Sequence, residues 1–365
     1  MNLFYVCFRE AQLLPRDLSV AGTNTRPVFW SLMGKNLILI LAATALASAA
    51  DLSNIRQLTS GGENAEAYWS PDSKRLIFQS TRGDLKCDQI FVMNADGSDQ
   101  HMVSTGKGRT TCGYFLPDNQ HILYASTHLA GDACPPAADR SKGYVWAVYA
   151  GYDIFSAKDD GSDLKRLTNA DGYDAEATVN WKTKTILYTS MASGDLDLWT
   201  MKLDGSNKKR LTETYGYDGG AVFSRDGKYI VWRGNHPDME AAKQKYAALL
   251  KDNLTSPMKM ELFISDAHGK HVKQLTNFNC ASFAPTFTPD GKQILFSSNK
   301  HDCDGRKFEL YLINVDGTGL RQVTDYGGFT SFPEFSPDGG KLVFVSDWKA
   351  PARYEFNVFT ADWSH

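Results

Sequence analysis

The sequence lacks the short motifs that identify several large classes of enzyme. It contains no G-x-S-x-G nucleophile motif, no H-E-x-x-H zinc-binding motif, no P-loop and no G-x-G-x-x-G dinucleotide-binding motif. No motif of the chain therefore indicates an α/β-type serine hydrolase, a zinc peptidase, a P-loop nucleotidase or a Rossmann-type dehydrogenase.

The chain also lacks an excess of charge of either sign. Its formal net charge is −3, and the basic residues form no stripe along the sequence. Isolated pairs such as Lys208-Lys209 are typical of solvated turns, whereas a nucleic-acid-binding protein is expected to carry a clustered basic surface. We therefore expect no nucleic acid among the partners.

Apolar runs long enough to span a bilayer are missing as well. The stretch at 37–46 is too short to cross comfortably, and it lies between Lys35 and the small residues Ala47-Ser48-Ala49, as in a cleaved signal peptide. The sequence predicts that 1–32 is an over-extension of the gene model and 33–50 the signal peptide. The mature chain, 51–365, is then periplasmic or secreted and has no stable membrane span. The alternative is an uncleaved membrane anchor.

What the sequence does contain is a repeated pattern of short apolar runs separated by turn signals. Residues 172–212 hold four such runs, and about 40 residues is the size of one four-stranded propeller blade. Three markers recur in a constant order. The closing strand has Leu or Val before Thr or Ser, centred on Leu58, Val103, Leu167, Leu211, Leu275 and Val323. The first turn carries Asp72, Asp118, Asp226, Asp290 and Asp338, and the last turn carries Gly97, Gly161, Gly205, Gly269 and Gly317.

These markers predict an all-β, six-bladed β-propeller built from four-stranded antiparallel blades. The blades are expected at 62–104, 108–168, 172–212, 216–276, 280–324 and 328–365. The sixth has only three strands of its own. We therefore expect the N-terminal strand at 55–59 to complete the last blade, because this closes the ring and removes two exposed edges.

The same markers resemble the repeat of the TolB-type β-propeller family, which is similar to WD40 repeats. A Ser/Thr-Pro-Asp turn, an Asp-Gly-Ser turn and an Arg-Leu-Thr strand recur across 55–365. The resemblance implies a stand-alone exported propeller without the additional domain of TolB itself, for which the residues ahead of the propeller leave no room. Prolyl-oligopeptidase-type enzymes have similar propellers, but their hydrolase motif is absent here.

The two faces of such a propeller carry different kinds of connection. One face, here termed the loop face, carries the connections between blades and between the second and third strands of each blade; the other, the turn face, carries the short turns. Insertions at 127–152 and 234–259 both belong to the loop face. The second is predicted to contain a helix at 237–251, whose apolar stripe of Met239, Ala242, Tyr246 and Leu249 packs on the propeller.

All five cysteines of 51–365 also fall on the loop face, and exported chains tend to pair their cysteines. We expect one disulfide between Cys280 and Cys303, which belong to the same blade. A second is expected between two of Cys87, Cys112 and Cys134, because an odd number leaves one cysteine over. A metal site built from these three is the alternative, although no C-x-x-C spacing favours it.

Acidic residues and histidines are predicted to converge on the channel mouth of the loop face. The candidate binding residues are Glu66, Asp174, Glu176, Asp218, His128, His236 and His301. Carboxylates and imidazoles suit a divalent metal ion or acid–base chemistry, and Glu66, Glu176, His236 and His301 are the candidate metal ligands. The alternative is that these side chains satisfy the channel rim and bind only water.

Two functions follow from this reading. The first is a non-enzymatic scaffold that binds a peptide, a protein of the cell envelope or a glycan through the loop face. The second is a metal-dependent hydrolase or lyase with its centre at the acidic, histidine-bearing mouth. Because no catalytic motif is complete, the sequence favours the first.

Overall fold

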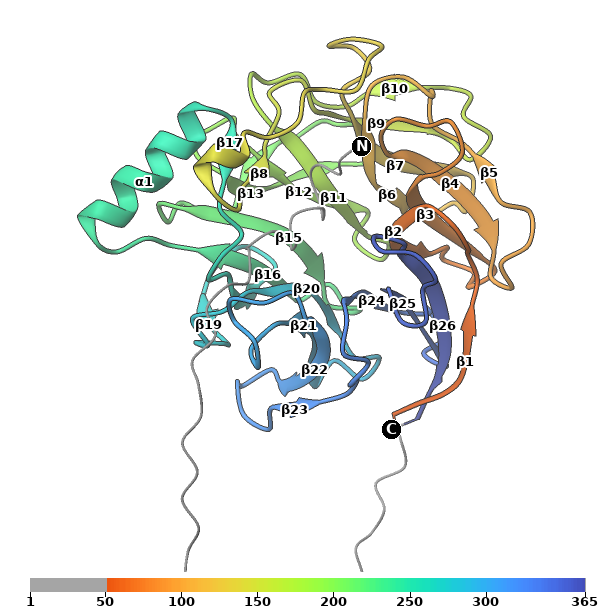
Figure 1. The fold of residues 1–365 in the computed structure, drawn as a ribbon. Helices are drawn as coiled ribbons and strands as arrows, with labels where there is room; N and C mark the ends of the chain where they lie inside the picture. Colours follow the sequence, from red (N-terminus) through yellow and green to blue (C-terminus); the bar gives the residue numbers. More distant parts are fainter. Residues whose placement is uncertain (1–50, 365) are drawn as a thin grey trace, which may run out of the picture.

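The computed structural model describes residues 51–364, which form six four-stranded sheets arranged around a common axis (Figure 1). Within each sheet the neighbouring strands are antiparallel. The predicted all-β, six-bladed propeller is confirmed.

Each blade runs from an innermost strand to a short outermost strand. Blades 1 to 3 comprise β2 (Glu63–Trp69), β3 (Arg75–Thr81), β4 (Gln89–Asn94) and β5 (His101–Met102); β6 (Thr110–Phe115), β7 (His121–Ser126), β9 (Asp153–Lys158) and β10 (Lys165–Arg166); and β11 (Asp174–Asn180), β12 (Thr185–Ser190), β13 (Asp197–Lys202) and β14 (Lys209–Arg210). Blades 4 to 6 comprise β15 (Tyr217–Phe223), β16 (Tyr229–Asn235), β18 (Glu261–Asp266) and β19 (Lys273–Gln274); β20 (Ser282–Phe287), β21 (Gln293–Ser298), β22 (Glu309–Asn314) and β23 (Arg321–Gln322); and β24 (Thr330–Phe335), β25 (Lys341–Ser346), β26 (Asn357–Trp363) and β1 (Leu52–Gln57).

The recurring sequence markers have direct structural roles. In the closing marker the threonine hydroxyl accepts a hydrogen bond from a backbone N–H of the third strand, at 2.9 Å for both Thr168 with Ile154 and Thr212 with Leu198. The preceding leucine is buried between blades, as for Leu167. Each marker therefore seals the outer edge of a blade with one hydrogen bond and one apolar contact.

The ring closes as the sequence predicts. β1 lies beside β26, with Leu52 opposite Trp363 and Gln57 opposite Phe359. The backbone N–H of Leu58 continues this pairing by donating to Val358 at 2.8 Å. Segments from opposite ends of the described chain thus share one sheet (Figure 1).

The two insertions meet on the loop face. β8 (Trp146–Ala147) pairs with β17 (Leu254–Thr255) in a small two-stranded sheet that joins the insertions of blades 2 and 4. A short 3-10 helix, η1 (Arg140–Lys142), precedes β8, and α1 (Glu240–Lys251) precedes β17.

The predicted helix is thus present, although it begins later than 237. Tyr246 and Leu249 are buried as expected, and the Tyr246 hydroxyl donates to Asp195 at 2.5 Å. Met239 is instead 69% exposed, because it stands at the N-terminal cap rather than on the packed stripe.

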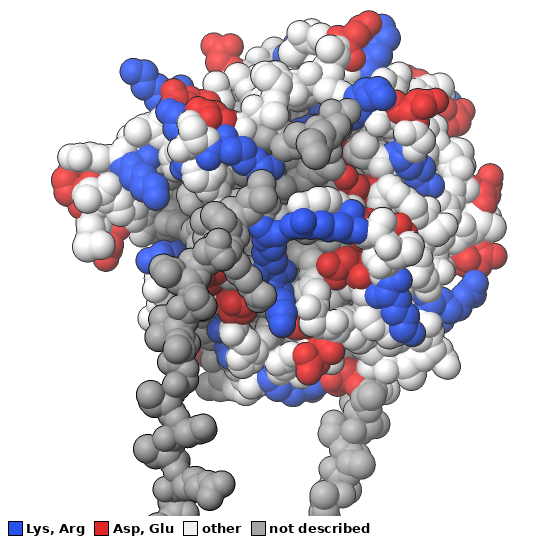
Figure 2. All heavy atoms as spheres, viewed as in Figure 1, with Lys and Arg blue, Asp and Glu red and all other residues white. Residues whose placement is uncertain are grey.

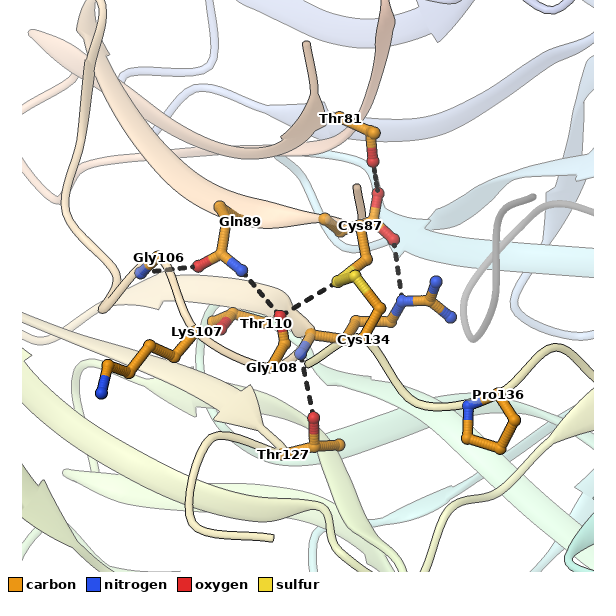
Figure 3. Close-up of a disulfide and its surroundings, with 12 residues drawn as sticks. Thr81, Cys87, Gln89, Gly106, Lys107, Gly108, Thr110, Thr127, Cys134 and Pro136 are labelled. Carbon is orange, nitrogen blue, oxygen red and sulfur yellow. Dashed lines mark hydrogen bonds and ion pairs between the residues drawn. A yellow bond between two sulfur atoms is a disulfide. The ribbon is translucent and has the colours of Figure 1, made fainter. Parts of the chain in front are cut away.

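Two disulfides fasten the loop face. Cys280–Cys303 forms within blade 5, as predicted. Cys87–Cys134 links the second-to-third-strand loop of blade 1 to the insertion of blade 2, and the buried Cys112 forms no disulfide. Figure 3 shows this disulfide beside Gly108, whose carbonyl accepts from the Gln89 side chain at 2.9 Å.

In the part of the chain that the structure describes, no helix combines the length and the apolar character needed to cross a membrane. The predicted over-extension at 1–32 and signal peptide at 33–50 lie outside the described residues.

Candidate ligand-binding cavity

Each of the six innermost strands contains a β-bulge at the same level of the propeller. The register with the second strand shifts between Ala65 and Tyr68 in blade 1, and the other five blades show the same shift. One bulge residue in each blade has a positive φ, from 45° to 57°: Glu66, Cys112, Glu176, Gly220, Ala284 and Phe332. Five of the six are not glycine, so the backbone accepts a strained conformation five times in equivalent places.

The bulges produce two rings of side chains around the axis. The upper ring consists of the six positive-φ residues. The lower ring lies two residues further along each strand and consists of Tyr68, Tyr114, Thr178, Val222, Thr286 and Glu334. All twelve residues line a cavity of about 220 Å³. Every blade therefore contributes to one cavity.

The cavity opens toward the turn face. Its lining continues past the lower ring to Lys182, Arg225 and Pro337, which belong to the first turns of blades 3, 4 and 6. Lys182 and Arg225 are exposed, so the three turn residues form the mouth of the cavity.

The loop-face end is filled by the blade 2 insertion. Trp146, which is 4% exposed, lies 5.4 Å from the ring of Phe283 and 5.4 Å from the guanidinium of Arg233. Val145 and Val148 join the same apolar cluster as Phe308, Phe329 and Phe332. The sequence predicted a site at the loop-face mouth, and that stays a prediction. Aromatic side chains pack at that end, whereas the lining of this cavity extends to the first turns on the turn face.

In the upper ring, Glu176 is held by a dense set of donors. Its carboxylate forms an ion pair with Arg233 and accepts hydrogen bonds from the Tyr217 hydroxyl at 3.0 Å, the Thr189 hydroxyl at 2.8 Å and the Gly220 N–H at 2.8 Å. Glu176 and Arg233 are 7% and 4% exposed, respectively. Because both charged groups are buried, the ion pair and these hydrogen bonds are needed to offset the loss of their hydration.

Gly220 makes room for that ion pair. A Cβ atom on Gly220 would lie 2.0 Å from the Arg233 Nη1, and one on Gly219 would lie 2.4 Å from Glu176 Oε2. In blade 4 the side chain of Arg233 thus fills the space next to Gly220, where the equivalent residues of the other five blades carry side chains of their own. Arg233 was not among the residues predicted from the sequence. The Gly219-Gly220 pair is the signal that could have indicated a large side chain beside Glu176.

In the lower ring, Glu334 is bonded only by neutral donors. Its carboxylate accepts from the Tyr114 hydroxyl at 2.8 Å and from the Trp69 N–H at 2.7 Å. Burial raises the pKa of Glu334 to about 7, although both hydrogen bonds and the charge of Arg225 act in the opposite direction. Burial and the neighbouring carboxylate together raise the pKa of Tyr114 well above its ordinary value. Glu334 was not among the residues predicted from the sequence, because a single glutamate within a strand belongs to no motif.

Aromatic rings form one side of the lower cavity. The ring centroids of Tyr68 and Tyr114 are 5.3 Å apart, and those of Tyr114 and Trp181 are 5.9 Å apart. The indole N–H of Trp181 donates to the Phe115 carbonyl at 2.9 Å, which fixes the ring on the wall. Blades 1 to 3 thus present a continuous aromatic surface to the cavity.

Of the seven predicted site residues, the structure brings Glu66 and Glu176 into this cavity. Asp218 and His236 lie outside its lining and contact each other, with 2.8 Å between the His236 Nε2 and Asp218 Oδ1. Asp218 also accepts from the Trp232 indole at 2.6 Å. Asp174 is buried in blade 3, where desolvation raises its pKa to about 6.

The three histidines occupy equivalent places, each on an aromatic ring of its own blade. The ring centroids are separated by 4.4 Å for His128 and Phe155, 4.7 Å for His236 and Phe263, and 5.8 Å for His301 and Tyr311. Burial also lowers the pKa of His128. The histidines therefore pack within their blades and do not line the cavity.

The candidate metal ligands do not assemble into one centre. Across residues 51–364, no group of three or more His, Cys, Asp or Glu side chains could hold a metal ion. Glu176 is committed to Arg233 and His236 to Asp218. The donor set in the described residues therefore does not fit a divalent cation, and a catalytic role for any of these side chains stays a prediction.

Charge on the visible surface is mixed. Figure 2 shows acidic and basic side chains interspersed around the edge of the molecule, with a group of basic side chains near the centre. On the loop face, burial lowers the pKa of Arg306, and Arg353 and Arg140 lie close enough to it for their charges to contribute to this lowering.

Comparisons with known proteins agree with this architecture. Residues 254–360 match the family described as TolB beta propeller domain. A comparison with curated proteins found no significant match.

Among solved structures, the putative TolB of Agrobacterium tumefaciens is similar, with 16% identity and a TM-score of 0.56 over 85% of this chain and 94% of that one. TolB of Acinetobacter baumannii has 16% identity and a TM-score of 0.52, over 83% of this chain and 64% of that one. The oligogalacturonate lyase of Vibrio parahaemolyticus has 11% identity and a TM-score of 0.51, over 84% of this chain and 93% of that one. At these identities the likeness concerns the fold alone.

Proposed function

We propose that this six-bladed β-propeller is a non-enzymatic binding protein whose ligand enters the central cavity from the turn face. The observation that carries this proposal is the cavity of about 220 Å³ to which all six blades contribute. Concave sites with aromatic walls and a few convergent polar groups are the usual form of ligand pockets. The ligand is then a peptide or protein segment of the cell envelope, or a glycan.

We further propose that the protein functions outside the cytoplasm. Two disulfides join loop-face segments, and disulfides persist mainly in oxidising compartments. A periplasmic or secreted location fits a protein that binds an envelope component.

The strained backbone supports a binding role for the cavity. Positive φ angles at five non-glycine positions are costly, and such strain gathers at functional sites. Here it turns side chains such as Glu66 and Glu176 toward the cavity.

Site-specific photo-crosslinking tests the proposal. A photoreactive residue replaces Lys182 at the mouth in one variant and Lys245, exposed on α1, in the other. We expect the variant at 182, exposed to envelope extract, to form adducts that the variant at 245 does not form. Adducts at 245 alone would move the binding surface to the loop face and reject the cavity.

A variant that fills the cavity provides a second test of the proposal. Thr286→Tyr adds a ring at a lower-ring position, and tyrosine already occupies this position as Tyr68 and Tyr114. The variant should therefore fold, and we expect it to lose the adducts at 182. Full retention of these adducts would show that the ligand does not enter the cavity.

A further inference from the structure

The cavity carries carboxyl groups in its interior and basic side chains at its mouth. Glu334 of the lower ring accepts hydrogen bonds from two neutral donors and lies within reach of the charge of Arg225, whereas Glu176 of the upper ring forms an ion pair with Arg233. Glu66 adds a further buried carboxylate to the upper ring. The interior therefore offers carboxylate acceptors.

The wall beside Glu334 suits a cation. Tyr114 donates its hydroxyl to that carboxylate, and its ring stands between Tyr68 and Trp181, at 5.3 and 5.9 Å. Aromatic faces attract ammonium groups, most strongly where water is excluded. A carboxylate next to aromatic rings is thus a cage for an alkylammonium group.

The mouth has the opposite character. Lys182 and Arg225 are exposed there, and Arg225 donates a hydrogen bond of 2.9 Å to the Ser336 carbonyl. The charge of Arg225 also acts on the carboxyl groups of Asp338 and Glu334. Lys182 and Arg225 repel a cation that approaches alone. A ligand that carries carboxylates beside its cation can pair these carboxylates with Lys182 and Arg225 while the cation enters the cavity.

From this arrangement we infer that the cavity receives a lysine side chain whose neighbours in the partner peptide or protein are acidic. The ammonium group enters the cage of Glu334, Tyr68, Tyr114 and Trp181, and the flanking carboxylates pair with Lys182 and Arg225. The inference rests on the proposed function, since it names the ligand class of the same cavity.

Two matched peptides test it with the full chain. The first is acetyl-Glu-Lys-Glu-amide, and the second replaces its lysine with glutamine. Titration followed by calorimetry should show the lysine peptide binding about tenfold more tightly, because only the lysine peptide carries the cation.

Substitutions show which residues are responsible for the preference for the lysine peptide. Glu334→Gln should weaken the lysine peptide about tenfold and leave the glutamine peptide unchanged. Glu240→Gln on α1 removes the same charge away from the cavity and should change neither affinity. A third peptide, acetyl-Ser-Lys-Ser-amide, should bind the wild type more weakly than acetyl-Glu-Lys-Glu-amide does. Lys182→Glu, at an exposed turn residue, should abolish this difference.

The outcomes separate the inference from the proposed function. Equal affinity of the two peptides, or no binding of the lysine peptide at millimolar concentration, would overturn the ammonium cage. Either result leaves the crosslinking at 182 standing as evidence for the cavity. Loss of that crosslinking would overturn both.

Discussion

Two glutamates in one cavity show how neighbouring residues set the state of a buried carboxyl group. Glu176 has an arginine beside it and accepts hydrogen bonds from four different residues. Glu334 accepts from a phenol and a backbone N–H, and burial raises its pKa to about 7. The first carboxylate is structural, while the second remains responsive to pH and to a bound cation.

The raised pKa predicts a pH dependence of stability. In the unfolded chain this carboxyl titrates near 4.5, so the folded state binds its proton more tightly between 4.5 and about 7. The corresponding contribution to the free energy of unfolding is fully present below pH 4.5 and is lost as the pH rises to about 7.

Denaturant titrations of the wild type and Glu334→Gln at several pH values measure this contribution. We expect the wild type to lose roughly 1–3 kcal/mol more than the variant between pH 4.5 and 7.5. Parallel curves for the two proteins would show that Glu334 titrates normally in the folded state.

The ion pair in the upper ring leads to a second residue-scale prediction. Arg233→Met keeps the apolar part of the side chain but leaves the Glu176 carboxylate without its cation, so we expect a loss of about 3–5 kcal/mol in the free energy of unfolding.

Combination with Glu176→Gln should restore part of that loss, because the uncompensated charge disappears. Denaturant unfolding of the wild type, both single variants and the double variant measures the coupling. Strictly additive losses would mean that the two side chains do not interact energetically.

At the scale of elements, the loop face is organised by contacts between insertions that are distant in sequence. β8 and β17 pair across more than one blade, and the disulfide Cys87–Cys134 fastens the insertion that carries Trp146. Together these elements close the loop-face end of the channel.

Removal of this disulfide should loosen the insertion without unfolding the blades. For Cys87→Ser/Cys134→Ser we expect a loss of about 2–4 kcal/mol in stability, together with faster hydrogen exchange across 127–152. Cys112→Ser is the control, since this thiol forms no disulfide. Unchanged exchange in the insertion would show that β8 and its apolar contacts hold the segment without the disulfide.

At the scale of the whole molecule, stability depends on closure of the ring. The sixth sheet joins β1 to β26, so the last blade is complete only when both ends of the propeller are in place. Without β1, the edge of β26 and the apolar side chains beneath it become exposed.

We therefore expect a chain that begins at Gly61 to melt roughly 10 °C or more below a chain that begins at Asp51. Thermal unfolding followed by circular dichroism compares the two. An unchanged melting temperature in the shorter chain would show that the five complete blades hold the sixth without its outer strand.

The repeat made most of the fold predictable from sequence. Turn residues such as Asp72 and closing threonines such as Thr168 act through local hydrogen bonds, so their pattern is visible in the chain itself. The same periodicity placed the insertions at 127–152 and 234–259 and the disulfide between Cys280 and Cys303.

The cavity was only half predictable. Alignment of the strand starts identified Glu66 and Glu176 as equivalent, and both line the cavity. The three histidines follow the second strand of their blades, and each packs on an aromatic ring of the third strand rather than on the cavity lining. A binding role for them stays a prediction.

The sequence by itself determined the number of blades, their order and the closing strand, because each depends on contacts that repeat along the chain. Tertiary structure alone decided which end of the channel is open and which charges are neutralised. Trp146 seals the loop-face end from an insertion, and Arg233 reaches Glu176 across the Gly219-Gly220 pair. Both depend on where non-repeating segments meet in space, which no repeat encodes.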